Sequence, residues 1–433
     1  MTKIILKKGR EDSLLRFHPW VFSGAIAQIA GEPAEGDIVG VFSQSGEFLA
    51  YGHYQVGSIA VRVLSFAGED VLAPDFWKNM IARALRVRIA AGLACPVAEP
   101  VEATEPAHTV PEPVEGPAEQ SLRQAAQRPS TAFTNCYRLI HGEGDGLPGL
   151  IIDYYDGVCV MQAHSVGMFR AKGAICEALK SVYGPSLKAV YDKSSGTAPF
   201  KAGLDLVDGY LYRSEEFSDD EQIVLENDHK FFVNWTEGQK TGFFLDQREN
   251  RALVGKYSRG RNVLNLFCYT GGFSVYALGN GAVHVDSVDS SRKAIDMVER
   301  NIALNDFDPS THTDYCADAI EFLRNVPEDK YDLMIVDPPA FAKHRGALNN
   351  ALRAYQRLNA AAISKVAPGG LIFTFSCSQV VDKEAFALAV FSAAAQTGRS
   401  VRILDRLNQP ADHSVNIYHP EGEYLKGLLL YVE

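Results

Sequence analysis

The decisive stretch of this sequence reads Asn265-Leu266-Phe267-Cys268-Tyr269-Thr270-Gly271-Gly272-Phe273. It ends an apolar strand that begins at Val263 and leads into a helix over 273–278. Glycines at such a turn let the backbone approach a ligand and start a helix tightly. The spacing is not G-x-G-x-x-G, so a dinucleotide turn is disfavoured and a hydride-transfer enzyme is the least favoured class. The absence of Gly-Lys-Ser/Thr excludes a P-loop.

Strands and helices alternate regularly from this turn onward. Strand-like apolar segments lie at 263–267, 284–288, 332–336 and 371–375. Helical patterns span 273–278, 292–305, 318–325 and 349–366. This alternation predicts an α/β domain with a parallel sheet and crossover helices, whose ligand crevice lies at the carboxyl ends of the strands. We expect the segments 415–417 and 425–432 to form an antiparallel hairpin at the sheet edge.

The chain before this region divides into two further parts, so three domains are expected, at 1–72, 73–215 and 216–433. The first has short strands and a helix over 11–16, which predict a small β-barrel; the strands are at 3–6, 37–42, 48–54 and 59–66. The second is a small α/β domain with helices at 74–92 and 167–183 and strands at 137–140, 150–155, 158–163 and 189–193. A hairpin around Asn227-Asp228, formed by 221–226 and 230–235, leads into the third.

An unusual segment, 96–131, interrupts the second domain. It is rich in Pro, Glu and Ala and contains a near-duplication, Glu99-Pro100-Val101-Glu102 and Glu112-Pro113-Val114-Glu115. Such a composition buries too little apolar surface to offset its ordering entropy, so we expect a mobile insertion. An interaction tail is the alternative interpretation.

The overall composition is that of a soluble globular protein. Of the 433 residues, 46% are hydrophobic and 22% are charged. No apolar run approaches the ~18 residues of a membrane span, and the start of the chain has too short an apolar stretch for a signal peptide. We therefore expect a cytoplasmic protein without a membrane partner. The seven cysteines form no C-x-x-C pair, which argues against a zinc knuckle, and no metal site is expected.

The net charge of −11 does not by itself indicate a nucleic-acid-binding protein, for which a basic surface is usual. Part of the imbalance is local, because six glutamates and no Lys or Arg lie between 97 and 120. Without these six the net charge would be −5. Contacts with RNA would therefore depend on local basic patches.

Two acidic residues follow the strands next to the glycine turn. Asp289 ends the second strand, where a carboxylate can accept hydrogen bonds from both hydroxyls of a ribose. Its alternative role is to cap the helix over 292–305. Asp318 follows the third strand, where it could hold an adenine amino group. A glycine turn, a ribose acid and an adenine acid in this order indicate S-adenosylmethionine.

Two further strand ends place a thiol and a carboxylate in the same crevice. The strand over 371–375 is followed by Ser376-Cys377-Ser378, and the strand over 332–336 by Asp337-Pro338-Pro339-Ala340-Phe341. This pairing suits methylation of a pyrimidine ring carbon, which needs a covalent nucleophile before the ring accepts a methyl group. On residue type alone Cys377 would be a buried core thiol, and the two prolines a rigid turn. An amino-group methyltransferase, whose polar-Pro-Pro-aromatic motif grips an exocyclic amine without a cysteine, is the serious rival.

Together these motifs resemble the RlmI-type class I methyltransferases, which make 5-methylcytosine in large-subunit ribosomal RNA. The resemblance rests on Gln239-Lys240-Thr241-Gly242-Phe243-Phe244-Leu245-Asp246-Gln247-Arg248, on the glycine turn, on Val288-Asp289 with Asn301 and Asn305, and on the Asp-Pro-Pro and Ser-Cys-Ser motifs. At the N-terminus, Leu6-Lys7-Lys8-Gly9-Arg10 and His18-Pro19-Trp20-Val21-Phe22-Ser23-Gly24 resemble the PUA domain of the family. Gly142 to Leu150 resembles its central domain. The segment 96–131 departs from the family pattern; this departure leaves the catalytic assignment intact and concerns only the docking of RNA.

The resemblance implies a seven-stranded, mostly parallel Rossmann-like sheet and assigns roles to individual residues. Cys377 would be the nucleophile, and Asp337 would orient the cytosine and support charge on its ring. The cofactor-binding residues would be Lys240, Thr241, Phe244, Asp246, Arg248, Asn265, Phe267, Tyr269, Gly271, Asp289, Ser290, Asn305, Asp318 and Asp337. The substrate-binding residues would be Pro338, Pro339, Phe341, Lys7, Lys8, Arg10 and Trp20. Without the resemblance, Phe243 and Phe244 would more often be core residues than a stacking platform.

The sequence therefore predicts an S-adenosylmethionine-dependent RNA cytosine-carbon-5 methyltransferase with large-subunit ribosomal RNA as its partner. The alternatives are a guanine or adenine amino-group methyltransferase and a non-catalytic, cofactor-binding protein of ribosome assembly. For the N-terminal barrel, a purely structural role is the alternative to RNA positioning. A homodimer is compatible with the pattern, and the target nucleotide is not encoded in any motif.

Overall fold

The computed structural model describes residues 1–66, 69–94, 133–199, 203–342 and 344–433. Its strands form an N-terminal sheet, a central sheet, a two-stranded hairpin and a C-terminal sheet. The predicted insertion at 96–131 lies outside the described residues.

The N-terminal sheet has six strands in the order β2-β6-β5-β4-β1-β3. They are β1 (Lys3–Leu6), β2 (Trp20–Phe22), β3 (Ile26–Ala30), β4 (Ile38–Phe42), β5 (Phe48–Tyr54) and β6 (Ile59–Ser65), with α1 (Asp12–Leu15) after β1. Neighbours are antiparallel except β1 and β4, which are parallel. Buried residues of β1, β2, β4, β5 and β6, mostly Val, Ile, Leu and Ala, enclose a small apolar core.

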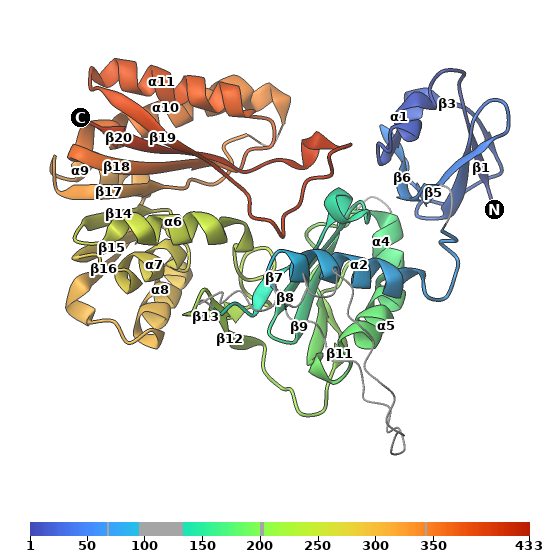
Figure 1. Cartoon of the computed structure of the whole chain (residues 1–433), viewed down its shortest axis with the longest axis horizontal. Helices are drawn as coiled ribbons and strands as arrows, with labels where there is room; N and C mark the ends of the chain where they lie inside the picture. The colour runs from blue at the N-terminus through green and yellow to red at the C-terminus, as the bar shows by residue number, and fades with distance from the viewer. Residues whose placement is uncertain (67–68, 95–132, 200–202, 343) are drawn as a thin grey trace, which may run out of the picture.

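The central sheet has the order β11-β10-β9-β8-β7. Its strands are β7 (Cys136–His141), β8 (Leu150–Tyr155), β9 (Val158–Ala163), β10 (Ala189–Asp192) and β11 (Gly209–Arg213). The helices α2 (Phe76–Ala90) and α5 (Lys172–Tyr183) pack together beside it (Figure 1). The single helix predicted over 167–183 is instead two, because α4 (Val166–Arg170) ends at Ala171 and α5 begins there.

A hairpin of β12 (Glu221–Glu226) and β13 (His229–Asn234) leads into the C-terminal sheet, as predicted. Its two turn residues, Asn227 and Asp228, both have positive φ, which is the conformation of a type I′ turn.

The C-terminal sheet has seven strands in the order β16-β15-β14-β17-β18-β20-β19. These are β14 (Asn262–Leu266), β15 (His284–Asp289), β16 (His312–Cys316), β17 (Tyr331–Val336), β18 (Val366–Ser376), β19 (Val401–Asn408) and β20 (Lys426–Val432). The first five are mutually parallel, and β20 runs antiparallel to β18 and β19. This confirms the predicted seven-stranded, mostly parallel α/β fold.

Helices cover both faces of this sheet (Figure 1). One face carries α6 (Arg248–Ser258), α7 (Gly272–Gly279) and α8 (Arg292–Leu304), and the other carries α9 (Ala319–Asn325), α10 (Leu348–Lys365) and α11 (Lys383–Thr397). The strands are apolar on both sides because each face packs against a helical layer.

The predicted strand at 415–417 is wrong. The partner of β20 is β19, and 415–417 belongs to the loop between them, where the Ile417 side chain is exposed. This loop extends away from the sheet towards the N-terminal part of the chain (Figure 1), and Tyr418 packs on Phe17 with ring centroids 5.2 Å apart. Tyr418 of this loop therefore joins two distant segments of the chain, and 415–417 lies outside the sheet.

Candidate active site

The turn after β14 is held in a conformation that few residues adopt. Phe267, Tyr269 and Gly271 all have positive φ. At Gly271 a Cβ atom would lie 3.1 Å from the Val298 side chain, so a larger residue would press on α8. Beneath the turn, Asn265 donates to the Ser274 hydroxyl at 2.8 Å. Contacts with α7 and α8 thus fix the turn on one side, and on the other side Phe267, Tyr269 and their neighbours line a cavity.

This cavity, of about 310 Å³, lies at the carboxyl ends of the parallel strands. Twelve of the residues predicted for catalysis or binding line it: Lys240, Phe244, Asp246, Phe267, Tyr269, Asp289, Ser290, Asp318, Asp337, Pro338, Pro339 and Cys377. They come from six separate segments, which only the folded sheet brings together.

Asp289 and Asp318 stand at one end of the cavity. Asp289 accepts hydrogen bonds from the backbone N–H groups of Tyr269 at 3.0 Å and Ser291 at 2.9 Å. The cap of α8 is the Ser291 side chain and not Asp289, so the alternative role predicted for Asp289 is filled by a neighbour. Asp318 caps α9 through one carboxylate oxygen, Oδ1. Both carboxylates are fixed by backbone donors and face the cavity.

Asp337 and Cys377 stand at the other end, on adjacent parallel strands. Val336 is paired with Thr374 in the ladder, so the two strand ends lie side by side. Asp337 accepts a hydrogen bond from the Gln247 amide at 3.0 Å. Burial, followed by the nearby Asp246 carboxylate, raises the pKa of Asp337 to about 7. Burial and the Asp337 carboxylate raise the pKa of the Cys377 thiol to about 11.

Asp246 is the second carboxylate at this end, and its pKa is lowered where that of Asp337 is raised. Burial opposes its ionisation, but Lys240, His413 and the Tyr424 hydroxyl outweigh burial and lower its pKa to about 2. The Tyr424 hydroxyl donates to Asp246 at 2.7 Å, and the Lys240 ammonium lies 3.9 Å away. The environment thus separates the two carboxyl groups into one that is charged and one that titrates near neutral pH.

Six of the site residues predicted in the C-terminal part lie outside the cavity: Thr241, Arg248, Asn265, Gly271, Asn305 and Phe341. The Thr241 hydroxyl donates to Asp153 at 2.6 Å. Asn305 exchanges hydrogen bonds with the Lys230 backbone and so ties the end of α8 to β13. Phe341 packs on Tyr355, with ring centroids 4.8 Å apart. In this structure these residues support the cavity wall.

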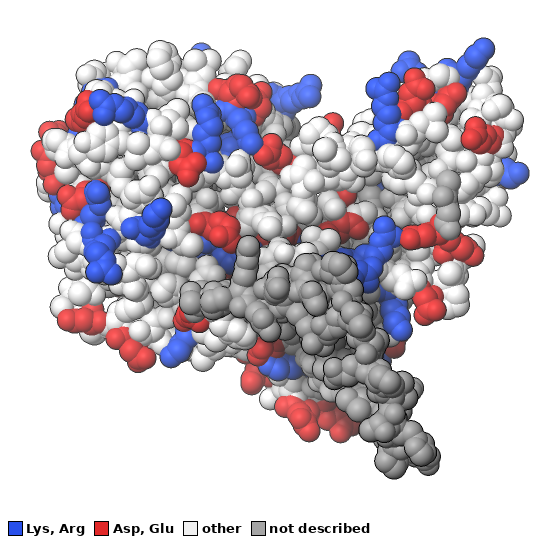
Figure 2. Space-filling model, viewed as in Figure 1, with Lys and Arg blue, Asp and Glu red and all other residues white. Residues whose placement is uncertain are grey.

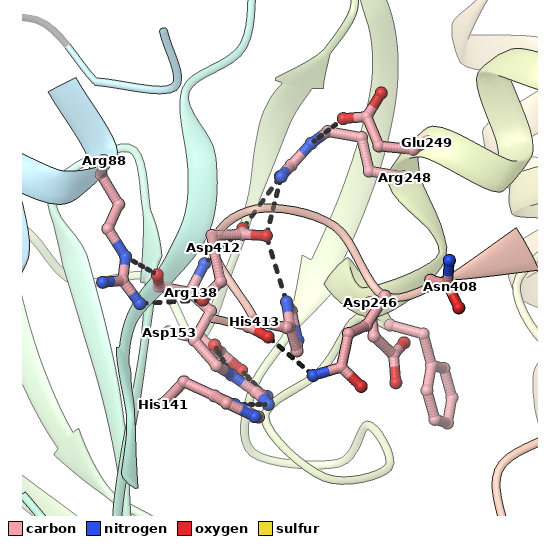
Figure 3. A network of polar contacts seen from close by, with 12 residues as sticks. Arg88, Arg138, His141, Asp153, Asp246, Arg248, Glu249, Asn408, Asp412 and His413 are labelled. Carbon is pink, nitrogen blue, oxygen red and sulfur yellow. Dashed lines mark hydrogen bonds and ion pairs between the residues drawn. The ribbon is translucent and has the colours of Figure 1, made fainter. Parts of the chain in front are cut away.

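Arg248 belongs to a buried network of charges that joins three parts of the chain (Figure 3). Its guanidinium lies 2.8 Å from Asp412 in the loop between β19 and β20. Asp412 also accepts from the Arg138 backbone N–H at 3.0 Å, and its carbonyl oxygen accepts from Arg88 at 2.8 Å. Arg138 is paired with Asp153, the acceptor of Thr241. The network therefore connects α2 and β7 of the central sheet to α6 and to the loop between β19 and β20.

Several residues in or near the cavity were not among the predicted site residues, and three of them make contacts that shape it. Gln247, although it lies within a motif that carries the resemblance, holds Asp337. Arg251, one helical turn further, pairs with Glu226 and donates to the Phe244 carbonyl at 2.9 Å. Lys426 begins β20, and its buried ammonium donates to the carbonyl oxygen of Ser378 at 2.7 Å. Burial lowers the pKa of Lys426 to about 8. Its proximity to the cysteine depends on the pairing of β18 with β20, which no local pattern reveals.

The predicted RNA-contacting residues lie apart from the cofactor end of the cavity. Lys7, Lys8 and Arg10 are exposed on the N-terminal sheet. The Trp20 indole donates to Glu143 at 2.9 Å and lines a second cavity of about 800 Å³, formed between the N-terminal, central and C-terminal parts. Lys240 lines both cavities.

Comparison with known proteins identifies the family. Residues 4–66 match a PUA-like domain, and residues 209–429 match an S-adenosylmethionine-dependent methyltransferase domain. The chain is 37% identical to ribosomal RNA large subunit methyltransferase I of Aeromonas hydrophila over 434 residues, covering 99% of each protein. The protein of the same name from Pseudoalteromonas translucida is also 37% identical, over 99% of this chain and 98% of its own. This chain belongs to the ribosomal RNA large subunit methyltransferase I family.

Solved structures agree with the fold of this methyltransferase family. The chain superposes on a proposed methyltransferase complexed with SAH with a TM-score of 0.77 and 21% identity, covering 100% of both chains. A SAM-dependent methyltransferase from Streptococcus mutans gives a TM-score of 0.76, again with 21% identity and full coverage of both chains. In the described part of this chain, no helix has the length and apolarity that a bilayer-spanning segment requires.

The cavity residues fit S-adenosylmethionine, the cofactor of the family. Asp246 Oδ1 is buried on the cavity wall and has no hydrogen-bond partner among the described residues. A charged carboxylate oxygen in that position suits the cationic end of the cofactor. Asp289 and Asp318 at the far end suit the hydroxyls of its ribose and the amino group of its adenine.

Proposed function

We propose that this protein forms 5-methylcytosine in large-subunit ribosomal RNA, in the cytoplasm, with Cys377 as a covalent nucleophile. The observation that supports it most is the position of Cys377 and Asp337 at one end of the cavity whose other end holds Asp289 and Asp318. The names of the relatives, ribosomal RNA large subunit methyltransferases, support the substrate class.

The proposed reaction begins at the sulfur of Cys377. Carbon 5 of cytosine is a poor nucleophile until a thiolate adds to carbon 6, which forms an S–C bond and moves the electron pair of the C5–C6 double bond towards carbon 5 and the ring nitrogen. S-adenosylmethionine supplies an electrophilic methyl group. Carbon 5 would take this methyl group as S-adenosylhomocysteine leaves. Transfer of the carbon-5 proton to a base would then re-form the C5–C6 double bond, and the S–C bond would break with its electron pair on sulfur, which restores the aromatic ring and the thiolate.

Asp337 would contribute to both halves of this reaction. With a pKa of about 7 it carries a proton in a large share of molecules at neutral pH, and it can donate that proton to the ring nitrogen as negative charge develops there. Burial is the first cause of the raised pKa of the Cys377 thiol, and a neutral Asp337 removes the second, the repulsion by its own carboxylate. The nearby Lys240 ammonium favours the thiolate as well.

The loop after Asp337 would receive the base. Pro338 and Pro339 have no N–H groups, which leaves backbone carbonyls free for the cytosine amino group. Phe341 packs on Tyr355 and remains half-exposed. The choice between carbon methylation and methylation of a guanine or adenine amino group therefore rests on Cys377.

The RNA strand would approach across the second cavity, because Lys240 and the C-terminal loop connect it to the reaction centre. Figure 2 shows Lys and Arg interspersed with Asp and Glu over the viewed face, in keeping with an overall net charge of −11. Binding would therefore depend on the local cations Lys7, Lys8 and Arg10 and on Trp20. The target cytosine must be unpaired or flipped out for carbon 6 to reach Cys377.

The decisive test is Cys377→Ala. With unmodified ribosomal RNA and labelled S-adenosylmethionine, the wild-type protein should yield labelled 5-methylcytosine on nucleoside analysis. The variant should lose about 10³-fold or more of this activity because the covalent route is closed. Its affinity for the cofactor should stay within about twofold of wild type, because Cys377 lies at the far end of the cavity from Asp289.

The matched control is Cys316→Ala, which removes an exposed cysteine from the same domain and should leave the rate unchanged. Retained activity in Cys377→Ala, or a methylated amino group as product, would refute the covalent mechanism. Cofactor binding by the wild-type protein without any turnover would instead indicate a non-catalytic role in ribosome assembly.

A further inference from the structure

Two histidines and a glutamate from opposite ends of the chain meet beside the second cavity. His18 precedes β2 of the N-terminal sheet, and His419 and Glu421 lie in the loop between β19 and β20. One potential ligand atom from each residue lies within 4.8 Å of those of the other two. Neither the reaction proposed above nor the matched domains assign a role to this group.

His419 is the member that most needs a partner. Its side chain is only 3% exposed, and neither ring nitrogen has a hydrogen-bond partner among the described residues. Nε2 lies 3.8 Å from the Glu421 carboxylate, beyond hydrogen-bond distance. Burying a polar group without a partner is unfavourable, so such a group in a native protein calls for an explanation.

His18 is held in a position that suits metal binding. Its Nδ1 accepts a hydrogen bond from the Trp20 backbone N–H at 3.3 Å and lies 3.4 Å from the Trp20 carbonyl oxygen. The first contact needs an unprotonated Nδ1. In the other tautomer Nδ1 donates to the carbonyl oxygen and Nε2 keeps its lone pair, which is how metal-binding histidines are usually oriented. The ring also packs edge-on against His419 with centroids 5.6 Å apart, so both imidazoles are fixed by aromatic neighbours.

We propose that His18, His419 and Glu421 bind a divalent transition-metal ion, zinc by the nature of the ligands. Two imidazole nitrogens and one carboxylate oxygen form a common set for this ion, with water in the fourth position. Small side-chain movements would bring the three atoms from their present separation into one coordination sphere.

The consequence would be a metal bridge between the first and last parts of the chain. The ion would fasten the N-terminal sheet to the C-terminal loop at the rim of the second cavity, which His419, Glu421 and Trp20 all line. Glu143 already receives hydrogen bonds from Trp20 and Arg62 at this junction. The ion would therefore add stability to an existing contact and would take no part in methyl transfer.

Titration of the full-length protein with Co²⁺ tests the site, because cobalt reports its ligands by visible absorption. One equivalent should bind with the spectrum of a nitrogen and oxygen site and without the thiolate-to-cobalt band that a cysteine would give. Competition with Zn²⁺ should displace it. Glu421→Gln, at an exposed position, should weaken binding by more than about tenfold, and His419→Ala should abolish it.

His344→Ala, which removes an exposed histidine elsewhere, is the control and should bind like wild type. Zn²⁺ should also raise the melting temperature of wild type and of this control but not of His419→Ala. Because Glu421 is exposed, its variant stays folded and keeps the test valid even if His419→Ala does not fold. The proposal is overturned if no stoichiometric binding occurs, if the thiolate band appears, or if Glu421→Gln binds as tightly as wild type.

Discussion

At the scale of single residues, burial and the nearby negative charge of Asp246 raise the pKa of the Asp337 carboxyl group. Its pKa is about 7 in the folded protein, against an ordinary value of 3.8. Because the folded state binds this proton more tightly than the unfolded state, the free energy of unfolding falls as pH rises from about 4 to about 7. The full difference corresponds to about 4 kcal/mol, which water in the open cavity reduces to about 2 kcal/mol.

Asp337→Asn should therefore stabilise the protein by about 2 kcal/mol at pH 8 and change little near pH 4, as urea unfolding across this range would reveal. The same variant should lose most methyl transfer, because an amide cannot supply a proton to the ring. Asp405→Asn, on the exposed strand β19, is the matched control for the substitution itself. An identical effect of Asp337→Asn at both pH values would contradict the assignment.

At the scale of elements, the buried pair of Arg248 and Asp412 fastens α6 to the loop between β19 and β20 (Figure 3). Asp412→Asn removes the charge that compensates a fully buried guanidinium, so it should lower the free energy of unfolding by about 3–5 kcal/mol. Arg248→Met combined with Asp412→Leu should lower the free energy of unfolding by less than this single change, because no unpaired charge remains.

Glu299→Gln, which breaks an exposed pair with Arg292, should lower the free energy of unfolding by less than about 1 kcal/mol and serves as the control in urea unfolding. Equal effects of Asp412→Asn and Glu299→Gln would show that the network is not structural.

Local patterns predict most of the C-terminal sheet but not the contacts that complete the site. The parallel strands carry continuous apolar runs between helices, and from these the meeting of Asp337 with Cys377 follows by topology. The motif around Asp246 was assigned by resemblance alone. The partners Arg138 and Asp412 are separated by 274 residues, and no periodicity links them. His18 and His419 are likewise brought together only by the fold. At 415–417 the apolar residues suggested a strand, but they lie in a loop.

At the scale of the whole molecule, the reaction centre and the predicted RNA-contacting cations lie in different parts of the chain. Lys7, Lys8 and Arg10 follow β1 in the N-terminal part, and the second cavity is lined by residues of the N-terminal, central and C-terminal parts. If the N-terminal part positions RNA, the affinity for RNA and the affinity for the cofactor should be separable. If the N-terminal part is only structural, removing its surface charges should change neither the affinity for RNA nor the affinity for the cofactor.

Replacing Lys7, Lys8 and Arg10 together by alanine distinguishes these cases. Each lost phosphate contact should reduce the slope of log affinity against log salt by about 1, so binding to ribosomal RNA should weaken by about tenfold or more at low salt. Cofactor affinity should be unchanged. The matched control replaces Lys256, Lys293 and Arg353, which are exposed on α6, α8 and α10 and remove the same total charge. Binding isotherms at several salt concentrations decide the outcome, since an equal loss in both triple variants would mean that the RNA senses only net charge and not the N-terminal surface.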